Sequence, residues 1–161
     1  MAPTVRARRT ARATRGAAAV EFAFVVPILL LLVFGLICYG YMFSFRQNLS
    51  QAASEGARAA VGAYSSSTCA TLATSGCVVT TSVQTAVASS LSTYRLSCGS
   101  GYLTCTISLV STAASGCPSG HTCVKVDVSY PYRAHPLIPT VPGLGVTMPS
   151  NLSFTSVVQV A

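Results

Sequence analysis

The stretch Arg15-Gly-Ala-Ala-Ala-Val-Glu-Phe22 joins two segments of opposite character, an arginine-rich leader and an apolar run that continues to Phe45. Glu21 is the only charged residue in that run. A carboxylate inside a membrane helix costs roughly 2.5–3.5 kcal/mol near the helix centre, so it usually marks a functional position. Glu21 lies five residues after Gly16, the glycine that ends the leader. This spacing indicates a site where the leader is cut and where the carboxylate is then used.

The apolar run predicts one helix that spans a lipid bilayer. Phe22–Phe45 contains 24 residues, which is about 36 Å of helix against roughly 30 Å of bilayer hydrocarbon. Pro27, near its start, is expected to kink the helix and free a backbone carbonyl. The leader arginines are expected to hold the N-terminus in the cytoplasm, which places the rest of the chain outside. We therefore divide the chain into a leader (1–16), a transmembrane helix (17–45), an amphipathic extension (46–63) and an extracytoplasmic domain (64–161).

The formal charge of +7 does not indicate nucleic-acid binding. Half of the ten basic residues lie in the leader. From residue 46 onward, five basic residues stand against two acidic ones, so this part of the chain carries only +3. These charges are widely spaced and form no basic patch of the kind that nucleic acids require. We expect no nucleic-acid partner.

Six of the seven cysteines follow the membrane run. An even number of cysteines in a small extracytoplasmic domain predicts three disulfides. Their order favours bonds between sequence neighbours, each closing a short loop rich in Ser, Gly and Thr, although other pairings stay open. Cys38 lies inside the run and is interpreted as a small apolar residue. The disulfide candidates are Cys69, Cys77, Cys98, Cys105, Cys117 and Cys123.

Small residues at helical spacing extend the helix beyond the membrane run. They fall on a single stripe, and small side chains allow another backbone to approach closely. The stripe packs either on its own domain or on neighbouring subunits, and both interpretations stay open. Its members are Leu49, Ala52, Ala53, Gly56, Ala57, Ala60 and Val61.

The remaining sequence predicts a second helix and a small antiparallel sheet, and hence an α+β fold. Apolar residues recur every four positions in a helix that runs to about Thr93, although their β-branched side chains also suit strands. Alternation of apolar and polar residues favours a half-buried strand at 122–132. Two further strands are expected at 102–110 and 152–160, and the proline-rich segment 136–149 is expected to be a loop. The apolar positions of the second helix are Val79, Val83, Val87 and Leu91.

No arrangement of residues indicates an enzyme. The chain has neither a nucleophile elbow nor a phosphate-binding glycine loop, and its acids are not paired. A metal site formed by His121 with Cys117 and Cys123 is the rival interpretation of that cysteine pair. It is disfavoured because no Cys-x-x-Cys pair occurs and an oxidising compartment opposes thiolate ligation. We expect no metal and no cofactor.

The segment Gly16-Ala-Ala-Ala-Val-Glu21-Phe22, followed by an apolar helix, resembles the prepilin cleavage site of the type IV filament superfamily. Residues 15–61 look more closely like the TadE-like family of the tight-adherence (Flp) pilus system. The quoted matches are Ala18-Ala-Val-Glu-Phe-Ala-Phe-Val-Val-Pro27 and Arg46-Gln-Asn-Leu-Ser-Gln-Ala-Ala-Ser-Glu-Gly-Ala-Arg58. One departure is Cys38, where these proteins often carry an acidic residue before an aromatic one.

This resemblance implies cleavage after Gly16 by a membrane prepilin peptidase, which leaves Ala17 as the new N-terminus. Glu21 would then pair with the charged terminal amine of a neighbouring helix, because neither charge is tolerated alone in low dielectric. The alternative for Glu21 is a carboxylate close enough to the interface to remain hydrated. Phe22 and Pro27 belong to the same assembly helix.

The sequence thus predicts a minor pilin-like subunit (pseudopilin) of a Flp-type pilus assembly or secretion machine that serves adhesion. Its expected partners are the prepilin peptidase, other pilin subunits, the inner-membrane assembly platform and the lipid bilayer. The alternative is an uncleaved single-pass anchor that displays a small binding domain. A secreted protein with a signal peptide fits poorly because the apolar run is too long, and a lipoprotein fits worse because Ile37 precedes Cys38.

Overall fold

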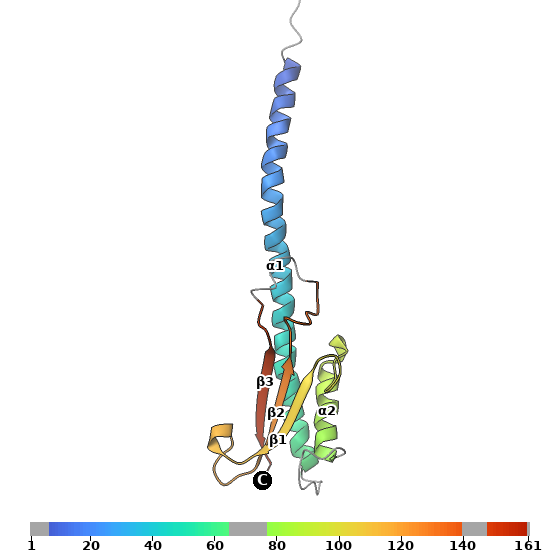
Figure 1. The fold of residues 1–161 in the computed structure, drawn as a ribbon, viewed down its shortest axis with the longest axis vertical. Helices are drawn as coiled ribbons and strands as arrows, with labels where there is room; N and C mark the ends of the chain where they lie inside the picture. Colours follow the sequence, from blue (N-terminus) through green and yellow to red (C-terminus); the bar gives the residue numbers. More distant parts are fainter. Residues whose placement is uncertain (1–6, 65–76, 140–147, 161) are drawn as a thin grey trace, which may run out of the picture.

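A single long helix, α1 (Ala7–Tyr64), organises the molecule. The computed structural model describes residues 7–64, 77–139 and 148–160. Figure 1 shows α1 as a rod whose first half stands clear, while the sheet and the second helix lie along its other half. Its 58 residues correspond to about 87 Å. The predicted helix through the membrane run and its extension is confirmed, and the helix also reaches back into the leader.

The helix continues through Pro27. Proline has no backbone N–H, so the carbonyl of Ala23 lacks its usual donor four residues later. Because α1 is helical on both sides of Pro27, residues 17–26 belong to the same helix as the part that contacts the folded domain.

The second helix, α2 (Val78–Ser90), packs beside α1. The side chains of Val79, Val83, Val87 and the following Leu91 have no exposed surface, as their four-residue spacing predicts. The helix ends earlier than expected, because a 3₁₀ turn over Ser92–Tyr94 follows and Arg95 then adopts a left-handed conformation.

Three antiparallel strands form the sheet in the order β1-β2-β3. They are β1 (Thr104–Val110), β2 (Cys123–Tyr130) and β3 (Leu152–Gln159). The alternation expected for the middle strand is confirmed, since Val124, Val126, Val128 and Tyr130 are all buried. The α+β prediction is therefore correct. Each strand lies within its predicted range, with ends that differ from the predicted ones by at most two residues.

The core lies where α1, α2 and β2 meet. Gly56 marks this junction, since a Cβ atom there would lie 3.1 Å from Val87 Cγ2, 3.2 Å from Val83 Cγ1 and 3.4 Å from Val126 Cγ1. A side chain at this position would make unusually tight contacts with all three valines, so glycine lets the helix approach them without a shift of these side chains.

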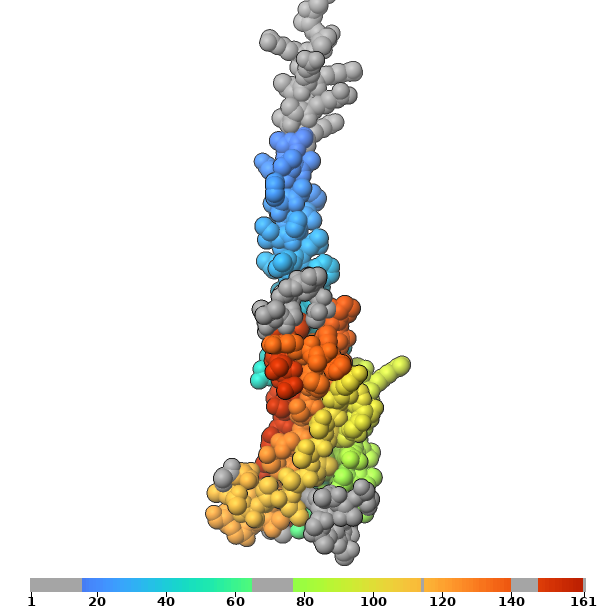
Figure 2. All heavy atoms as spheres, in the orientation of Figure 1, coloured from blue at the N-terminus to red at the C-terminus, as the bar shows by residue number. Residues whose placement is uncertain are grey.

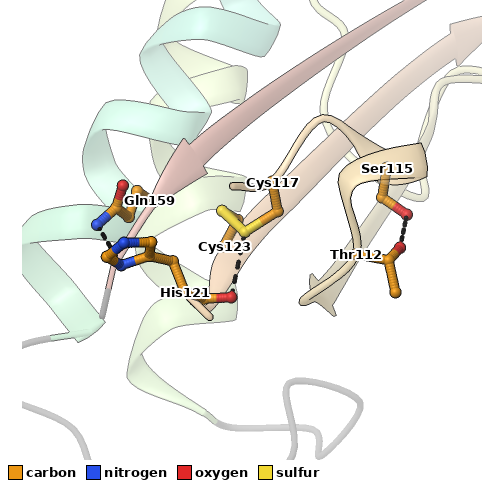
Figure 3. The surroundings of a disulfide bond; sticks show 6 residues. All are labelled: Thr112, Ser115, Cys117, His121, Cys123 and Gln159. Atoms are coloured by element: carbon orange, nitrogen blue, oxygen red, sulfur yellow. Dashed lines mark hydrogen bonds between the residues drawn. A yellow bond between two sulfur atoms is a disulfide. The ribbon is translucent and has the colours of Figure 1, made fainter. Parts of the chain in front are cut away.

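Two of the predicted disulfides link sequence neighbours, Cys98–Cys105 and Cys117–Cys123. Figure 3 shows the second, which closes the loop between β1 and β2 beside a hydroxyl pair formed by Thr112 and Ser115. Cys77 is also disulfide-bonded. Cys69, its predicted partner, lies outside the described residues, as do Pro142, Gly143 and Gly145 of the proline-rich segment.

Candidate functional site

The predicted processing junction lies within α1, and no other element covers it. Gly16 and Ala17 are helical and exposed. A Cβ atom at Gly16 would meet nothing within 4 Å, and its backbone has no positive φ. The fold itself therefore does not require glycine at this position, in contrast to Gly56. Its presence at the junction suits recognition by another molecule.

Glu21 and Phe22 lie on the same uncovered part of α1. Both side chains are exposed, and Phe22 exposes 70 % of its surface. Among the residues that the structure describes, none forms an ion pair or hydrogen bond with Glu21. One helical turn separates Ala17 from Glu21, so both face the same side of the rod.

Between Val20 and Ile37, most of the large apolar side chains are exposed, without any cover from the domain. Figure 2 shows this half of α1 as a bare column above the folded part. Burying one such side chain stabilises a protein by about 1.5–3 kcal/mol relative to leaving it in water. Exposure of this whole surface to water would therefore be unfavourable. The exposed residues are Val20, Phe22, Phe24, Val25, Ile28, Leu29, Leu30, Leu31, Leu32, Val33, Phe34, Leu36 and Ile37.

By length and composition, α1 is the one described helix that could cross a membrane. The domain begins to cover it at Cys38, of which 4 % is exposed. The uncovered segment from Ala17 to Ile37 therefore contains 21 residues, about 31 Å of helix, which matches the roughly 30 Å of bilayer hydrocarbon. The predicted transmembrane range of 17–45 thus extends beyond the uncovered segment into a part that the domain covers.

An aromatic cluster, which the sequence analysis missed, attaches the domain to α1 at this point. Phe45 is fully buried, and its ring centroid lies 4.9 Å from that of Tyr94 and 5.2 Å from that of Tyr130. Tyr132 lies 6.0 Å from Phe45, and Tyr41 contacts Tyr94 edge to face. The cluster consists of four tyrosines and one phenylalanine from three separate segments. Their aromatic character can be read from the sequence, but nothing in their spacing indicates that they meet.

Tyr130, the last residue of β2, and Tyr132, two residues further on, differ in the hydrogen bonds of their hydroxyl groups. The Tyr130 hydroxyl donates to the carbonyl oxygen of His135 at 2.8 Å. The Tyr132 hydroxyl is buried without a partner among the described residues. Burial, followed by the nearby Tyr41, raises the pKa of Tyr132 to about 12. Burial also raises the pKa of Tyr130.

The small-residue stripe packs on the protein's own domain. All of its members from Leu49 to Ala60 are buried, whereas 40 % of Val61 is exposed. The opposite face of α1 is polar and exposed, with an ion pair of 3.4 Å between Arg58 and Glu55. The first of the two interpretations is therefore confirmed.

The rival metal site at His121 is wrong, because the disulfide consumes both cysteine sulfurs. Figure 3 shows the imidazole turned toward Gln159, whose Nε2 lies 2.8 Å from His121 Nδ1. In the described part of the chain, no three His, Cys, Asp or Glu side chains are grouped so that they could hold a metal ion.

Comparison with known proteins gives one match. Residues 16–58 match the family described as TadE-like protein. No curated protein and no solved structure matches the chain. The matched segment begins at Gly16 and contains the uncovered half of α1 together with most of the half that the domain covers. The similarity to the TadE-like family therefore covers residues 16–58 of this chain.

Proposed function

We propose that this protein is a minor pilin-like subunit, a pseudopilin, of a Flp-type pilus assembly or secretion machine that serves adhesion. One observation carries the proposal. The TadE-like match begins at Gly16, the residue at which the arginine leader ends and the uncovered apolar helix starts. TadE-like proteins are generally non-enzymatic pilus components.

In this proposal, α1 anchors the protein in the cell membrane with its N-terminus in the cytoplasm. A prepilin peptidase removes residues 1–16, and the new amine of Ala17 and the carboxylate of Glu21 then pair between neighbouring helices. Pairing offsets the cost of holding either charge in low dielectric. The disulfides Cys98–Cys105 and Cys117–Cys123 in the C-terminal domain agree with an oxidising, extracytoplasmic location. The partners are other pilin subunits and the inner-membrane assembly platform.

The first experiment measures the intact mass of the membrane-extracted protein, expressed with and without a matching prepilin peptidase. The expected result is a mass loss that corresponds to residues 1–16, only when the peptidase is present. Gly16→Leu should abolish this loss. The matched control is Gly35→Leu, because Gly35 also lies on α1 with nothing within 4 Å of its Cβ position, and this variant should still be cleaved.

An unshortened leader in the native host would contradict the proposal. It would favour the second candidate function, an uncleaved single-pass anchor that displays the disulfide-braced domain. This alternative accounts for the uncovered helix and the domain, but it leaves the open glycine at the junction and the unpaired Glu21 unexplained.

A second experiment tests the role of Glu21. Glu21→Gln should leave cleavage intact but weaken co-purification with the other pilin subunits by about tenfold or more, since an uncompensated charge in the membrane costs roughly 2.5–3.5 kcal/mol. Glu55→Gln is the control, because Glu55 lies on the exposed polar face of the same helix and pairs only with Arg58. Equal co-purification of the two variants would exclude the proposed pairing.

A further inference from the structure

The charged residues outside the leader and the apolar run are divided between the two ends of the folded domain. Glu55 pairs with Arg58 at 3.4 Å, and Asp127 pairs with Lys125 at 3.1 Å. Both exported acids are therefore neutralised locally. The net charge of +3 from residue 46 onward rests on three remaining residues, Arg46, Arg95 and Arg133.

These three arginines, here called the arginine collar, are exposed and surround the end of the domain nearest the uncovered half of α1. Arg46 follows Phe45 of the aromatic cluster. Arg95 follows Tyr94, which contacts Phe45, and Arg133 follows Tyr132, which lies beside the same phenylalanine. Figure 1 shows that β2 ends and β3 begins at this end of the sheet, whereas the chain terminates at the opposite end.

None of the collar arginines forms an ion pair with a carboxylate among the described residues. The Arg133 guanidinium donates to the carbonyl oxygen of Met148, with its Nε at 2.9 Å. Arg46 lies over the ring of Phe154, 5.7 Å from its centroid. Arg46 also lines a shallow groove of about 380 Å³ together with Phe43, Gln47, Ser50 and Phe154. The groove combines one cation and two polar side chains with two aromatic walls.

The collar lies just above the headgroup layer of a bilayer, which adds about 5–8 Å to the hydrocarbon on each side, so that long side chains can reach that layer. Arg46 lies nine residues beyond Ile37, the last residue before the buried Cys38, which is about 13 Å along the helix. Helical side chains lean toward the N-terminus, so the guanidinium lies closer to the membrane than its Cα atom. The headgroup layers together add about 10–15 Å to the hydrocarbon thickness. Tyr39 and Phe43, exposed between these levels, have the chemistry of an interfacial aromatic belt.

We propose that the arginine collar binds the phosphate groups of anionic phospholipids in the outer leaflet of the membrane that holds α1. Arg46 provides the cation at the groove, Gln47 and Ser50 provide hydrogen-bond donors, and Phe43 and Phe154 form the aromatic walls beside the bound phosphate. Arg95 and Arg133 add positive charge around the rest of the domain's rim. The collar thereby sets the height of the domain above the bilayer. This inference rests on the proposed anchoring of α1.

The test uses the full chain, reconstituted in phosphatidylcholine vesicles that contain a nitroxide-labelled lipid. Electron spin resonance then measures how strongly labelled phosphatidylglycerol, relative to labelled phosphatidylcholine, associates with the protein. The decisive variant is Arg46→Gln with Arg95→Gln, which leaves the Arg133 bond to Met148 in place. The matched control, Arg58→Gln with Lys125→Gln, removes the same charge from the distal part of the domain. All proteins retain the leader, so its own attraction for anionic lipid cancels in the comparison.

An arginine at an anionic surface is worth roughly fivefold in association, so the collar variant should lose about fivefold or more of its phosphatidylglycerol preference. The control should keep the preference of the wild type. Arg46→Lys with Arg95→Lys should also keep it, because charge is the property that is required. Equal losses in the collar variant and the control would overturn the proposal, as would a loss in the lysine variant or no loss at all.

Two further outcomes separate this inference from the proposed function. If the protein does not float with the vesicles in a density gradient, the anchoring of α1 fails and the collar proposal fails with it. If the protein floats but shows no phosphatidylglycerol preference, only the collar proposal fails. Defective pilus assembly in the collar variant with unchanged lipid preference would assign the arginines to an acidic protein partner instead.

Discussion

At the scale of single residues, Tyr130 and Tyr132 make opposite contributions to the stability of the domain. The hydroxyl of Tyr130 donates to the His135 carbonyl, whereas that of Tyr132 is buried without a partner in the described part of the chain. A buried polar group without a hydrogen bond costs about 1–3 kcal/mol, and a typical hydrogen bond contributes about 1 kcal/mol. The same substitution at the two sites should therefore have opposite signs.

We predict that Tyr132→Phe raises the free energy of unfolding by about 1 kcal/mol and that Tyr130→Phe lowers it by about 1 kcal/mol. Urea unfolding in detergent micelles, followed by the near-ultraviolet circular dichroism of tyrosine, measures both. Destabilisation by Tyr132→Phe would show that its hydroxyl has a partner in the folded protein.

The raised pKa of Tyr132 predicts a loss of stability in alkali. Its ordinary value of 10.0 applies to the unfolded chain, and the folded value is about 12. Below pH 10 both states hold the proton. Between pH 10 and 12 the unfolded state loses it first, so the free energy of unfolding should fall by roughly 1.4 kcal/mol per pH unit.

The alkaline measurement is a series of urea titrations across this pH range in a Cys38→Ala background, because Cys38 is a free thiol that could exchange with the disulfides. Adding Tyr132→Phe should remove most of the alkaline slope. An unchanged slope would assign it to other groups, with Tyr130 the next to examine.

At the scale of the element, α1 consists of two parts with different surroundings, and the boundary between them lies near Cys38. Before this residue its apolar side chains are exposed, and after it a stripe of small residues packs against α2 and the sheet. Beyond Cys38 only one face of α1 is covered by the domain, as Phe43 and Phe45 show, although both belong to the predicted transmembrane range. The first exposes 57 % of its surface and the second none.

We predict that Phe45→Ala lowers the free energy of unfolding of the domain by about 3–5 kcal/mol, the usual cost of removing a buried phenylalanine. Phe43→Ala is the matched control, and it should change this free energy by no more than about 0.5 kcal/mol, as expected for an exposed residue. Chemical unfolding in micelles compares the two. If both changes were neutral, Phe45 would lie in lipid and the wider span of 17–45 would hold.

At the scale of the whole molecule, the two described disulfides lie at opposite ends of the sheet. Cys105 pairs across the sheet with Val128, and Cys123 pairs with both Val110 and Gln159. Each disulfide closes a short loop, with sequence separations of 7 and 6 residues. Neither spans the junction between the sheet and α1, so each acts on its own end of the domain.

We predict that replacing either cysteine pair by serines costs about 2–3 kcal/mol, as expected for short loops. Since the two sites share no partners, the costs should add to within about 0.5 kcal/mol when both pairs are removed. Unfolding titrations of the two double variants and the quadruple variant provide the comparison. A combined cost far from the sum would show that the two ends of the sheet are coupled.

The periodic features of this chain could be predicted from the sequence because they depend on local chemistry. Each of these features reflects the geometry of one element in an apolar environment. They are the apolar run, the four-residue spacing of Val79, Val83 and Val87, and the alternation along Val124–Tyr130. The same is true of the disulfides between sequence neighbours. The junction at Gly16 and Glu21 is likewise a feature of consecutive residues.

Other properties depend on contacts between residues far apart in the sequence, and only the tertiary structure decided them. The aromatic cluster joins Phe45, Tyr94, Tyr130 and Tyr132, and no pattern along the chain indicates that these residues meet. For this reason the sequence placed Cys38 and Phe45 in the membrane run, although the domain buries both. The arginine collar has the same origin, because only the fold brings Arg46, Arg95 and Arg133, which lie far apart in the sequence, to one end of the domain.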